Sequence, residues 1–62
     1  MYHKRLICKD QGGYYVTLTL GKAYREVIGE DKNLPDVLVR IIDDTGESYL
    51  YPRKFFKESE NV

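Results

Sequence analysis

The tripeptide Asp44-Thr45-Gly46 has the composition of the loop that carries the catalytic carboxylate in aspartic proteases. Such an enzyme needs two of these loops, because two neighbouring carboxylates must share one proton. This chain of 62 residues contains one, so an active site would require a homodimer. Glu47 follows the glycine and would add a negative charge beside the two carboxylates. The chain is also too short for the framework that holds such a pair.

The same residues fit a tight hairpin turn. An aspartate at the first position and a glycine at the fourth suit a type I turn, and Gly46 can adopt the left-handed conformation of a bulged hairpin. Asp43 or Asp44 can also accept hydrogen bonds from nearby backbone N–H groups. We therefore predict that residues 43–46 form a turn between two strands. Because the sequence shows no nucleophile–base pair and no phosphate-binding loop, we predict no enzymatic activity.

Metal and cofactor sites are not indicated either. Cys8 is the only cysteine and His3 the only histidine. One chain therefore cannot form a disulfide or assemble a zinc site from Cys and His ligands. We interpret the three acids Asp43, Asp44 and Glu47 as a hydrated hairpin tip and not as a cation site. The sequence predicts no metal and no cofactor.

The balance of charged residues argues against some classes of binding partner. Ten Lys and Arg residues match ten Asp and Glu residues, so the formal net charge is zero. A duplex-DNA binder would usually be basic, because neutralising phosphates supplies most of its affinity. No apolar run is long enough for a membrane span or a secretory segment. Together with the single free thiol, this favours a cytoplasmic location.

Alternating apolar and polar residues between turn signals predict an all-β fold. The pattern indicates one small domain over residues 1–62, a small antiparallel barrel of five strands with one short helical turn. Segment 14–20 fits either a half-buried strand or an extended loop arm, and a tail at 57–62 is expected to fray. We expect strands near 2–9, 15–20, 23–30, 37–42 and 47–51, a helical turn near 52–55, and a short final strand fragment.

The inward faces of these strands define the expected core. If Leu50 points inward, Tyr49 and Tyr51 must point at least partly outward, because side chains alternate along a strand. The expected core consists of Leu6, Cys8, Leu18, Leu20, Tyr24, Val27, Val39, Ile41, Leu50 and Phe55 or Phe56.

Two stretches, LTLGKAYREVIGE (18–30) and IIDDTGESYLYPRKFF (41–56), carry a family resemblance. They are similar to a Leu-Thr-x-Gly-Lys-x-Tyr segment and an Ile-x-Asp-Asp-x-Gly-x-x-x-x-Tyr-Pro hairpin. These motifs occur in small Src-homology-3-type barrel proteins of Gram-positive bacteria and their phages. The likeness covers roughly residues 6 to 57, and its motifs are structural, so it bears on the fold more than on any activity.

The resemblance implies a Src-homology-3-like barrel and an accessory protein encoded by a phage or prophage. Proteins of this kind bind a host protein, for example one with a defence role, and inhibit or redirect it. The peptide-binding members of the wider fold carry an Ala-Leu-Tyr-Asp-Tyr stretch and a groove tryptophan. This chain has neither, so we do not expect it to bind polyproline peptides.

Four tyrosines and two basic residues form the predicted partner-binding surface. Tyrosine is enriched at protein interfaces, because it buries a large area at low entropic cost and keeps a polar hydroxyl. The alternative is that these rings cap a thin core. The leading interpretation is a non-enzymatic module that binds a host or cellular protein through Tyr14, Tyr15, Tyr49, Tyr51, Arg53 and Lys54.

Basic residues near both ends support a second interpretation. They would converge if the terminal strands pair, and with Tyr2 they would suit single-stranded nucleic acid. The alternative is a solvated sheet edge that lysines protect against aggregation. The runner-up function is therefore a small barrel that binds single-stranded nucleic acid or the ribosome, using Lys4, Arg5, Lys9, Arg53, Lys54 and Lys57.

The segment 37–42 is apolar on both faces, whereas a small barrel has only one interior. Excess apolar surface of this kind is usually buried by self-association. We therefore predict a homodimer whose interface includes Val37, Leu38 and Ile42.

Overall fold

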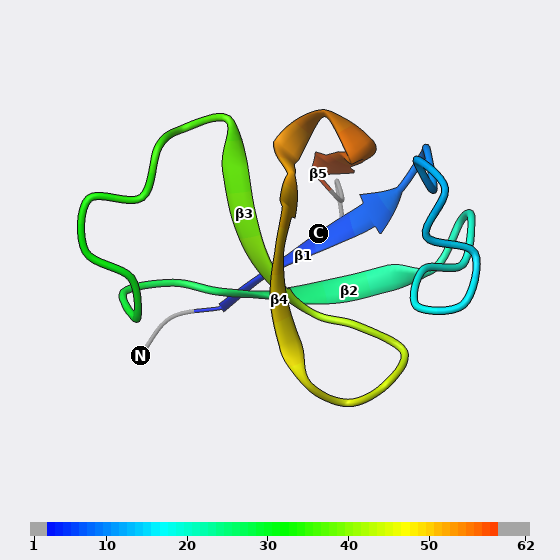
Figure 1. Ribbon diagram of the computed structural model, residues 1–62, viewed down its shortest axis with the longest axis horizontal. Helices are drawn as coiled ribbons and strands as arrows, with labels where there is room; N and C mark the ends of the chain where they lie inside the picture. The colour runs from blue at the N-terminus through cyan, green and yellow to red at the C-terminus, as the bar shows by residue number, and fades with distance from the viewer. Residues whose placement is uncertain (1–2, 59–62) are drawn as a thin grey trace.

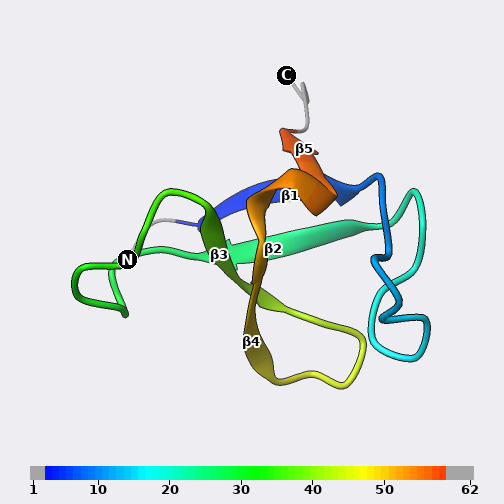
Figure 2. The same ribbon diagram turned by 45° about the horizontal axis from the view of Figure 1, so that its top comes forward.

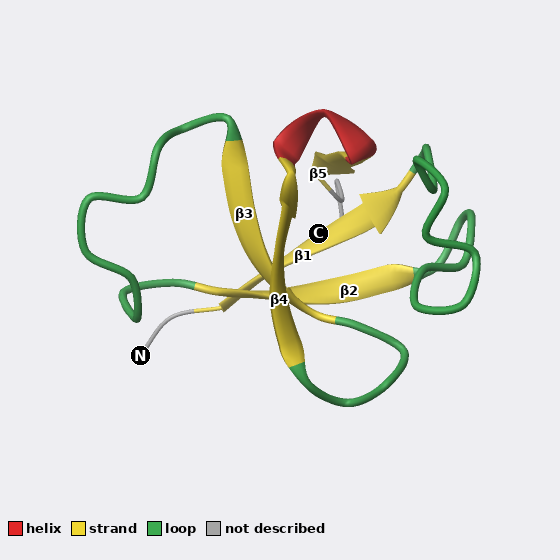
Figure 3. Cartoon of the chain, viewed as in Figure 1, coloured by secondary structure: helices red, strands yellow, loops and turns green. Residues whose placement is uncertain are grey.

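The computed structural model describes residues 3–58, which form five antiparallel strands and one 3-10 turn (Figure 1, Figure 3). Two sequence-based predictions, for Tyr2 and for residues 59–62 of the tail, lie outside the described residues. The elements are β1 (His3–Cys8), β2 (Ala23–Val27), β3 (Leu38–Ile42), β4 (Ser48–Pro52), η1 (Arg53–Phe55) and β5 (Phe56–Glu58).

The strands form one sheet in the order β4-β3-β2-β1-β5. Figures 1 and 2 show that β3 and β4 run across β1 and β2, so that the sheet curls into a half-barrel. The prediction of an all-β antiparallel fold with a helical turn near 52–55 and a short final strand is confirmed. Lys57 and Glu58, expected in a frayed tail, instead belong to β5, where Lys57 pairs with Ile7 of β1.

The predicted strand at 15–20 is wrong, because residues 9–22 form a turn-rich loop, which we call the arm. Its local hydrogen bonds are those of turns, for example from Leu18 N–H to the Tyr14 carbonyl oxygen at 2.9 Å. Gly12 and Gly13 both have positive φ angles, which bend the chain at the start of the arm. Leu18 reaches the core, whereas Val16 and Leu20 remain exposed despite their alternating positions.

One contiguous core fills the curve of the sheet. The predictions for Leu20 and Leu50 as core residues are wrong, and Val27 at the end of β2 is only half-buried. The buried apolar residues are Leu6, Cys8, Leu18, Tyr24, Val39, Ile41, Tyr51, Phe55 and Phe56. All except Tyr51 were predicted, with Phe55 and Phe56 given as alternatives, and both of these are buried.

The register between β3 and β4 explains why Tyr51, and not Leu50, is buried in the core. Tyr51 lies opposite Val39, whose side chain is fully buried. Residues directly opposite each other in an antiparallel pair point to the same face, so Tyr51 must point inward. Leu50 instead lies opposite Arg40 on the outer face of the sheet. The expectation that Tyr51 points outward is therefore wrong.

Residues 43–46 form the predicted turn. Gly46 N–H donates to the Asp43 carbonyl oxygen at 2.9 Å, and Asp43 N–H donates to the Glu47 carbonyl oxygen at 3.0 Å. Gly46 has φ of 87°, the left-handed conformation that a bulge of this kind requires. This turn joins β3 to β4 and fixes their register.

Candidate functional site

A hollow of about 260 Å³ lies between the arm and β4. The ring of Tyr14 meets the ring of Tyr51 edge-on at 5.0 Å between centroids, and lies 6.2 Å from that of Phe55. Both contacts fix the arm against the half-barrel. The hollow is lined by Tyr14, Thr17, Thr45, Tyr49, Leu50 and Tyr51, so three of the four predicted tyrosines are brought together.

Large apolar side chains are exposed on the arm and on β4, the two segments that border this hollow. Tyr15 and Val16 on the arm are 74% and 87% exposed, and Tyr49 on β4 is 53% exposed. Tyr14 and Leu50 are exposed at the margin of the hollow itself. We call these five residues the aromatic patch: Tyr14, Tyr15, Val16, Tyr49 and Leu50. Leu50 was missed from the sequence because it was assigned to the core, and Val16 was not among the predicted site residues.

Tyr51 forms the buried wall of the hollow and is not part of the exposed surface. Only 2% of the residue is exposed. Its hydroxyl donates to Asp43 Oδ2 at 2.7 Å and lies 2.9 Å from Thr17 Oγ1. Burial in this position raises the pKa of Tyr51 to about 12. A partner could not contact the ring without displacing the arm.

Arg53 and Lys54 lie apart from the tyrosine hollow. They line a second hollow of about 670 Å³, together with Asp36, Val37, Leu38 and Pro52. Arg53 Nε donates to the Asp36 carbonyl oxygen at 2.7 Å, and its Nη2 lies 3.6 Å from Glu26 Oε2. The guanidinium therefore holds the loop before β3 against η1. The expected cationic border directly beside the tyrosines is not formed.

The predicted dimer residues lie at the ends of β3 or just before it. Val37 is 70% exposed, whereas Leu38 and Ile42 are half-buried. Arg40 stands between them on the same face, with Nε and Nη2 bonded to the Asp31 carboxylate at 2.8 and 3.0 Å. The outer face of β3 is thus interrupted by a charged pair. Dimerisation through these residues stays a prediction.

The Asp43 carboxylate is occupied by contacts within the turn and with β4. It accepts hydrogen bonds from the backbone N–H and the hydroxyl of Thr45, and from the Tyr51 hydroxyl. Burial alone would raise the pKa of Asp43, but the bonds from Thr45 and Tyr51 outweigh it and hold the pKa below its ordinary value.

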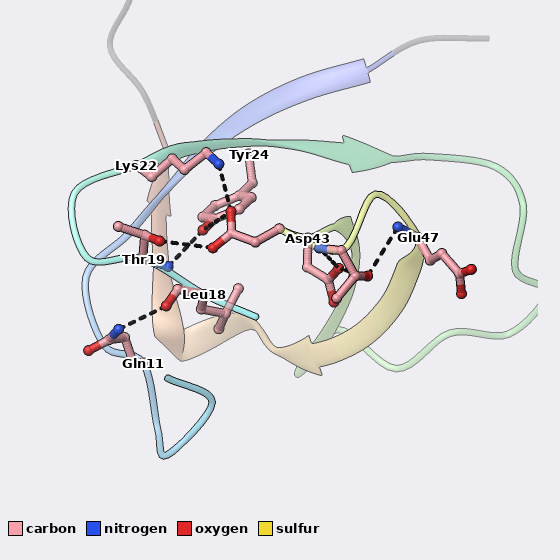
Figure 4. A network of polar contacts seen from close by, with 9 residues as sticks. Gln11, Leu18, Thr19, Lys22, Tyr24, Asp43 and Glu47 are labelled. Atoms are coloured by element: carbon pink, nitrogen blue, oxygen red, sulfur yellow. Dashed lines mark hydrogen bonds and ion pairs between the residues drawn. The ribbon is translucent and has the colours of Figure 1, made fainter. Parts of the chain in front are cut away.

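Asp44 connects the turn to the arm residues Thr19 and Lys22, which Figure 4 shows together with Tyr24. Its carboxylate accepts bonds from Lys22 Nζ at 2.6 Å, Thr19 Oγ1 at 2.8 Å and the Tyr24 hydroxyl at 3.0 Å. The bond from Lys22 is the main reason why the pKa of Asp44 is lowered. Asp43 and Asp44 therefore both stabilise the fold. Asp43 bonds within the turn and to β4, and Asp44 bonds to the arm.

The terminal strands pair, as the nucleic-acid interpretation required. Two of the six basic residues of this interpretation nevertheless lie beside acids. Lys4 Nζ is 3.1 Å from Glu58 Oε2. Arg53 lies beside Glu26, so its charge is partly balanced as well.

Residues 3–58 offer neither a cluster of metal ligands nor a membrane-spanning helix. In that part of the chain, no group of three or more His, Cys, Asp or Glu side chains could hold a metal ion. No helix there is long and apolar enough to cross a membrane. Cys8 is a buried free thiol, and burial raises its pKa.

No family model, no curated protein and no solved structure matches this chain.

Proposed function

We propose that this chain is a non-enzymatic protein-binding module that contacts its partner through the aromatic patch. The observation that carries the proposal is a hollow lined by the exposed residues Tyr14, Tyr49 and Leu50, with the exposed Tyr15 and Val16 directly following Tyr14 in the arm. A cluster of exposed apolar side chains is costly in water and is typical of interaction surfaces. Tyrosine-rich surfaces bind proteins well because the rings are large and lose little entropy.

The patch rests on a well-anchored support. Asp44 N–H donates to the Thr17 carbonyl oxygen at 3.0 Å, and Gln11 Nε2 donates to that of Leu18 at 2.8 Å. These bonds hold Thr17 and Leu18, in the middle of the arm, while Tyr14 packs against Tyr51. A surface that is already ordered before binding loses less entropy when the partner arrives, which favours affinity.

We also propose that the half-barrel is of the Src-homology-3 type. Three features support this assignment: a long arm between β1 and β2, a short bulged hairpin between β3 and β4, and a 3-10 turn directly before β5. The motif resemblance then extends the proposal to the partner. We propose a host protein, bound and inhibited or redirected by a phage- or prophage-encoded accessory protein in the cytoplasm.

Binding to single-stranded nucleic acid has weaker support. The net charge is zero, and Lys4 and Arg53 both lie beside carboxylates. A phosphate backbone would have to compete with these acids. Nucleic-acid binding would also weaken steeply as salt rises, whereas an aromatic protein contact would not.

The proposal can be tested by capturing partners from a Gram-positive host lysate and then measuring binding of the purified partner. Tyr15→Ala removes an exposed ring from the patch, and Val37→Ala removes exposed apolar atoms from a different surface. We expect Tyr15→Ala to weaken binding by about fivefold or more, as loss of about 1 kcal/mol implies. Val37→Ala should bind like the wild type.

Thermal melts of each variant separate binding from folding. Equal binding by wild type, Tyr15→Ala and Tyr49→Ala would refute the aromatic patch as the binding surface. Capture of nucleic acid alone, with affinity that falls steeply with salt, would favour the alternative function.

A further inference from the structure

The hollow between the arm and β4 has an uncharged lining that covers an ionised carboxylate. The six described residues of the lining are tyrosines, threonines and a leucine, with no Lys, Arg, Asp or Glu among them. Asp43 lies behind this lining, and only 5% of it is exposed. Thr45 and Tyr51, which both line the hollow, donate hydrogen bonds to the Asp43 carboxylate. The negative charge is therefore separated from the lining by a single hydrogen bond.

The charge of Asp43 is not balanced by a cation of the described chain. Its hydrogen bonds come from neutral donors, and its lowered pKa keeps the carboxyl ionised at neutral pH. None of the ion pairs within residues 3–58 includes Asp43. The neighbouring Asp44, by contrast, is paired with Lys22 at 2.6 Å. Because solvent screens a buried charge only weakly, the field of Asp43 favours a cation in the hollow.

The directions of the hydroxyl bonds give the lining free acceptors. A carboxylate can only accept, so the one proton of the Tyr51 hydroxyl is directed to Asp43. Thr17 Oγ1, 2.9 Å from the Tyr51 oxygen, must then be the donor of that second bond. Thr45 Oγ1 donates to Asp43. Both threonine hydroxyls have thus used their protons, and their remaining lone pairs can only accept hydrogen bonds from an occupant.

Two half-exposed rings complete the hollow. Tyr14 is 47% exposed and Tyr49 is 53% exposed, and both belong to the lining. The face of an aromatic ring attracts a cation that lies within about 6 Å of its centroid. The volume of about 260 Å³ can accept the end of one long side chain. An anion in the same place would meet acceptors and a buried negative charge, so the hollow discriminates against it.

We propose that this hollow binds the Lys or Arg side chain of a basic segment in the partner protein. In the complex, the ammonium or guanidinium group lies between the rings of Tyr14 and Tyr49 and donates to the hydroxyls of Thr17 and Thr45. Both cationic groups carry several N–H donors and no acceptor, which matches the lining. The inference rests on the proposed function, because it names the kind of partner that the aromatic patch recognises.

NMR titration of the whole chain with four small probes tests the inference without an identified partner. The probes are the N-acetyl amides of arginine, lysine, norleucine and glutamate, at matched ionic strength. Norleucine has the carbon chain of lysine without its charge. We expect the arginine and lysine probes to shift the amide resonances of Thr45 and Tyr49, and the tighter of the two identifies the preferred side chain. The norleucine and glutamate probes should leave these resonances unchanged.

Matched variants test the contribution of the ring. Tyr49→Phe keeps the ring, whereas Tyr49→Leu keeps apolar bulk without it. We expect Tyr49→Leu to bind the cationic probes about fivefold or more weakly than Tyr49→Phe. Tyr15→Leu removes a ring that lies outside the lining and should bind them like the wild type.

The contribution of Asp43 can be measured without a substitution. If the ionised carboxylate favours the bound cation, the bound cation must favour the ionised carboxylate by the same free energy. The pKa of Asp43, followed by NMR, should therefore fall further when the arginine probe is bound. The norleucine probe is the control.

Five results would overturn the inference: equal binding of the norleucine and lysine probes, binding of the glutamate probe, no binding by any probe, equal binding by Tyr49→Leu and Tyr49→Phe, or an Asp43 pKa that the arginine probe leaves unchanged. The proposed function would survive any of them if Tyr15→Ala still weakened binding of the purified partner. Conversely, cationic probes may bind as expected while Tyr15→Ala and Tyr49→Ala bind the partner like the wild type. That result would refute the proposed function and keep the hollow as a site for cations.

Discussion

The hydroxyl of Tyr51 donates a 2.7 Å hydrogen bond to Oδ2 of Asp43, and both residues are buried. The bond joins β4 to the turn that precedes it. Because the same hydroxyl lies 2.9 Å from Thr17 Oγ1, one phenol links the sheet, the hairpin and the arm. The Tyr51 ring, which was expected to face a partner, instead packs beneath the surface that we propose binds the partner.

Tyr51→Phe should destabilise the protein more than its small change in volume implies. It removes the hydroxyl and leaves a buried carboxylate with one donor fewer. Loss of a hydrogen bond to a charged group costs about 1.5–3 kcal/mol. Urea unfolding measures the difference, and Tyr49→Phe, a half-exposed ring on the same strand, is the control. Equal stability of the two variants would contradict the role assigned to this bond.

Stability should fall in acid through Asp43 and Asp44. The pKa of each carboxyl is lowered in the folded protein, so each favours folding fully above its ordinary value of 3.8. This contribution is lost as pH falls below about 4 and through the lower folded pKa values. Chemical unfolding at several pH values measures the slope. Asp44→Asn should flatten it.

Gly12→Ala should be far more damaging than Gly13→Ala. Both glycines have positive φ, so each alanine bears the strain of the left-handed region, about 1–2 kcal/mol. A Cβ at Gly12 would also lie 2.0 Å from Cζ of the buried Phe55, whereas one at Gly13 would meet nothing within 4 Å. Overpacking of this kind adds about 1–3 kcal/mol. Thermal melts of the two variants provide the comparison.

Gly46→Val tests the turn against the protease interpretation. A β-branched residue tolerates φ of 87° poorly, so stability should fall although no neighbouring atom obstructs the side chain. Asp44→Asn should lower stability modestly and leave partner binding intact. If Asp44→Asn instead abolished a measurable peptide-cleaving activity, the aspartate would have to be catalytic.

Local signals were sufficient to predict the turn and the 3-10 element. Asp43 and Gly46 specify their turn through their own backbone preferences. Pro52 lies directly before η1 as its N-cap residue, with an extended backbone (φ −60°, ψ 132°). The sequence of β4 alone does not predict which of its two faces points into the core. Both Tyr49-Tyr51 and Leu50 alternate correctly, and only the pairing of Val39 with Tyr51 decides which set is inside.

The arm shows a second limit of periodicity. Val16, Leu18 and Leu20 alternate like a strand, yet the glycines around them allow turns, and Leu18 alone is buried. The position of Tyr14 beside Tyr49 and Leu50 follows from the way the arm folds back onto the hairpin. No residue pattern within the arm or within β4 predicts that these side chains lie close together.

The attachments of the arm determine when the aromatic patch can form. The β3–β4 hairpin closes over a short stretch of chain, whereas Thr17 meets Tyr51 across 34 positions and Thr19 meets Asp44 across 25. Closing a long loop costs more entropy than closing a short one, so the hairpin should be structured in the folding transition state and the arm should dock afterwards. Mutations in the arm would then mainly accelerate unfolding. Loss of the arm by local opening would remove Tyr14 and Tyr15 from their binding positions while the sheet stays folded, so the lifetime of the binding-competent surface can be shorter than that of the fold.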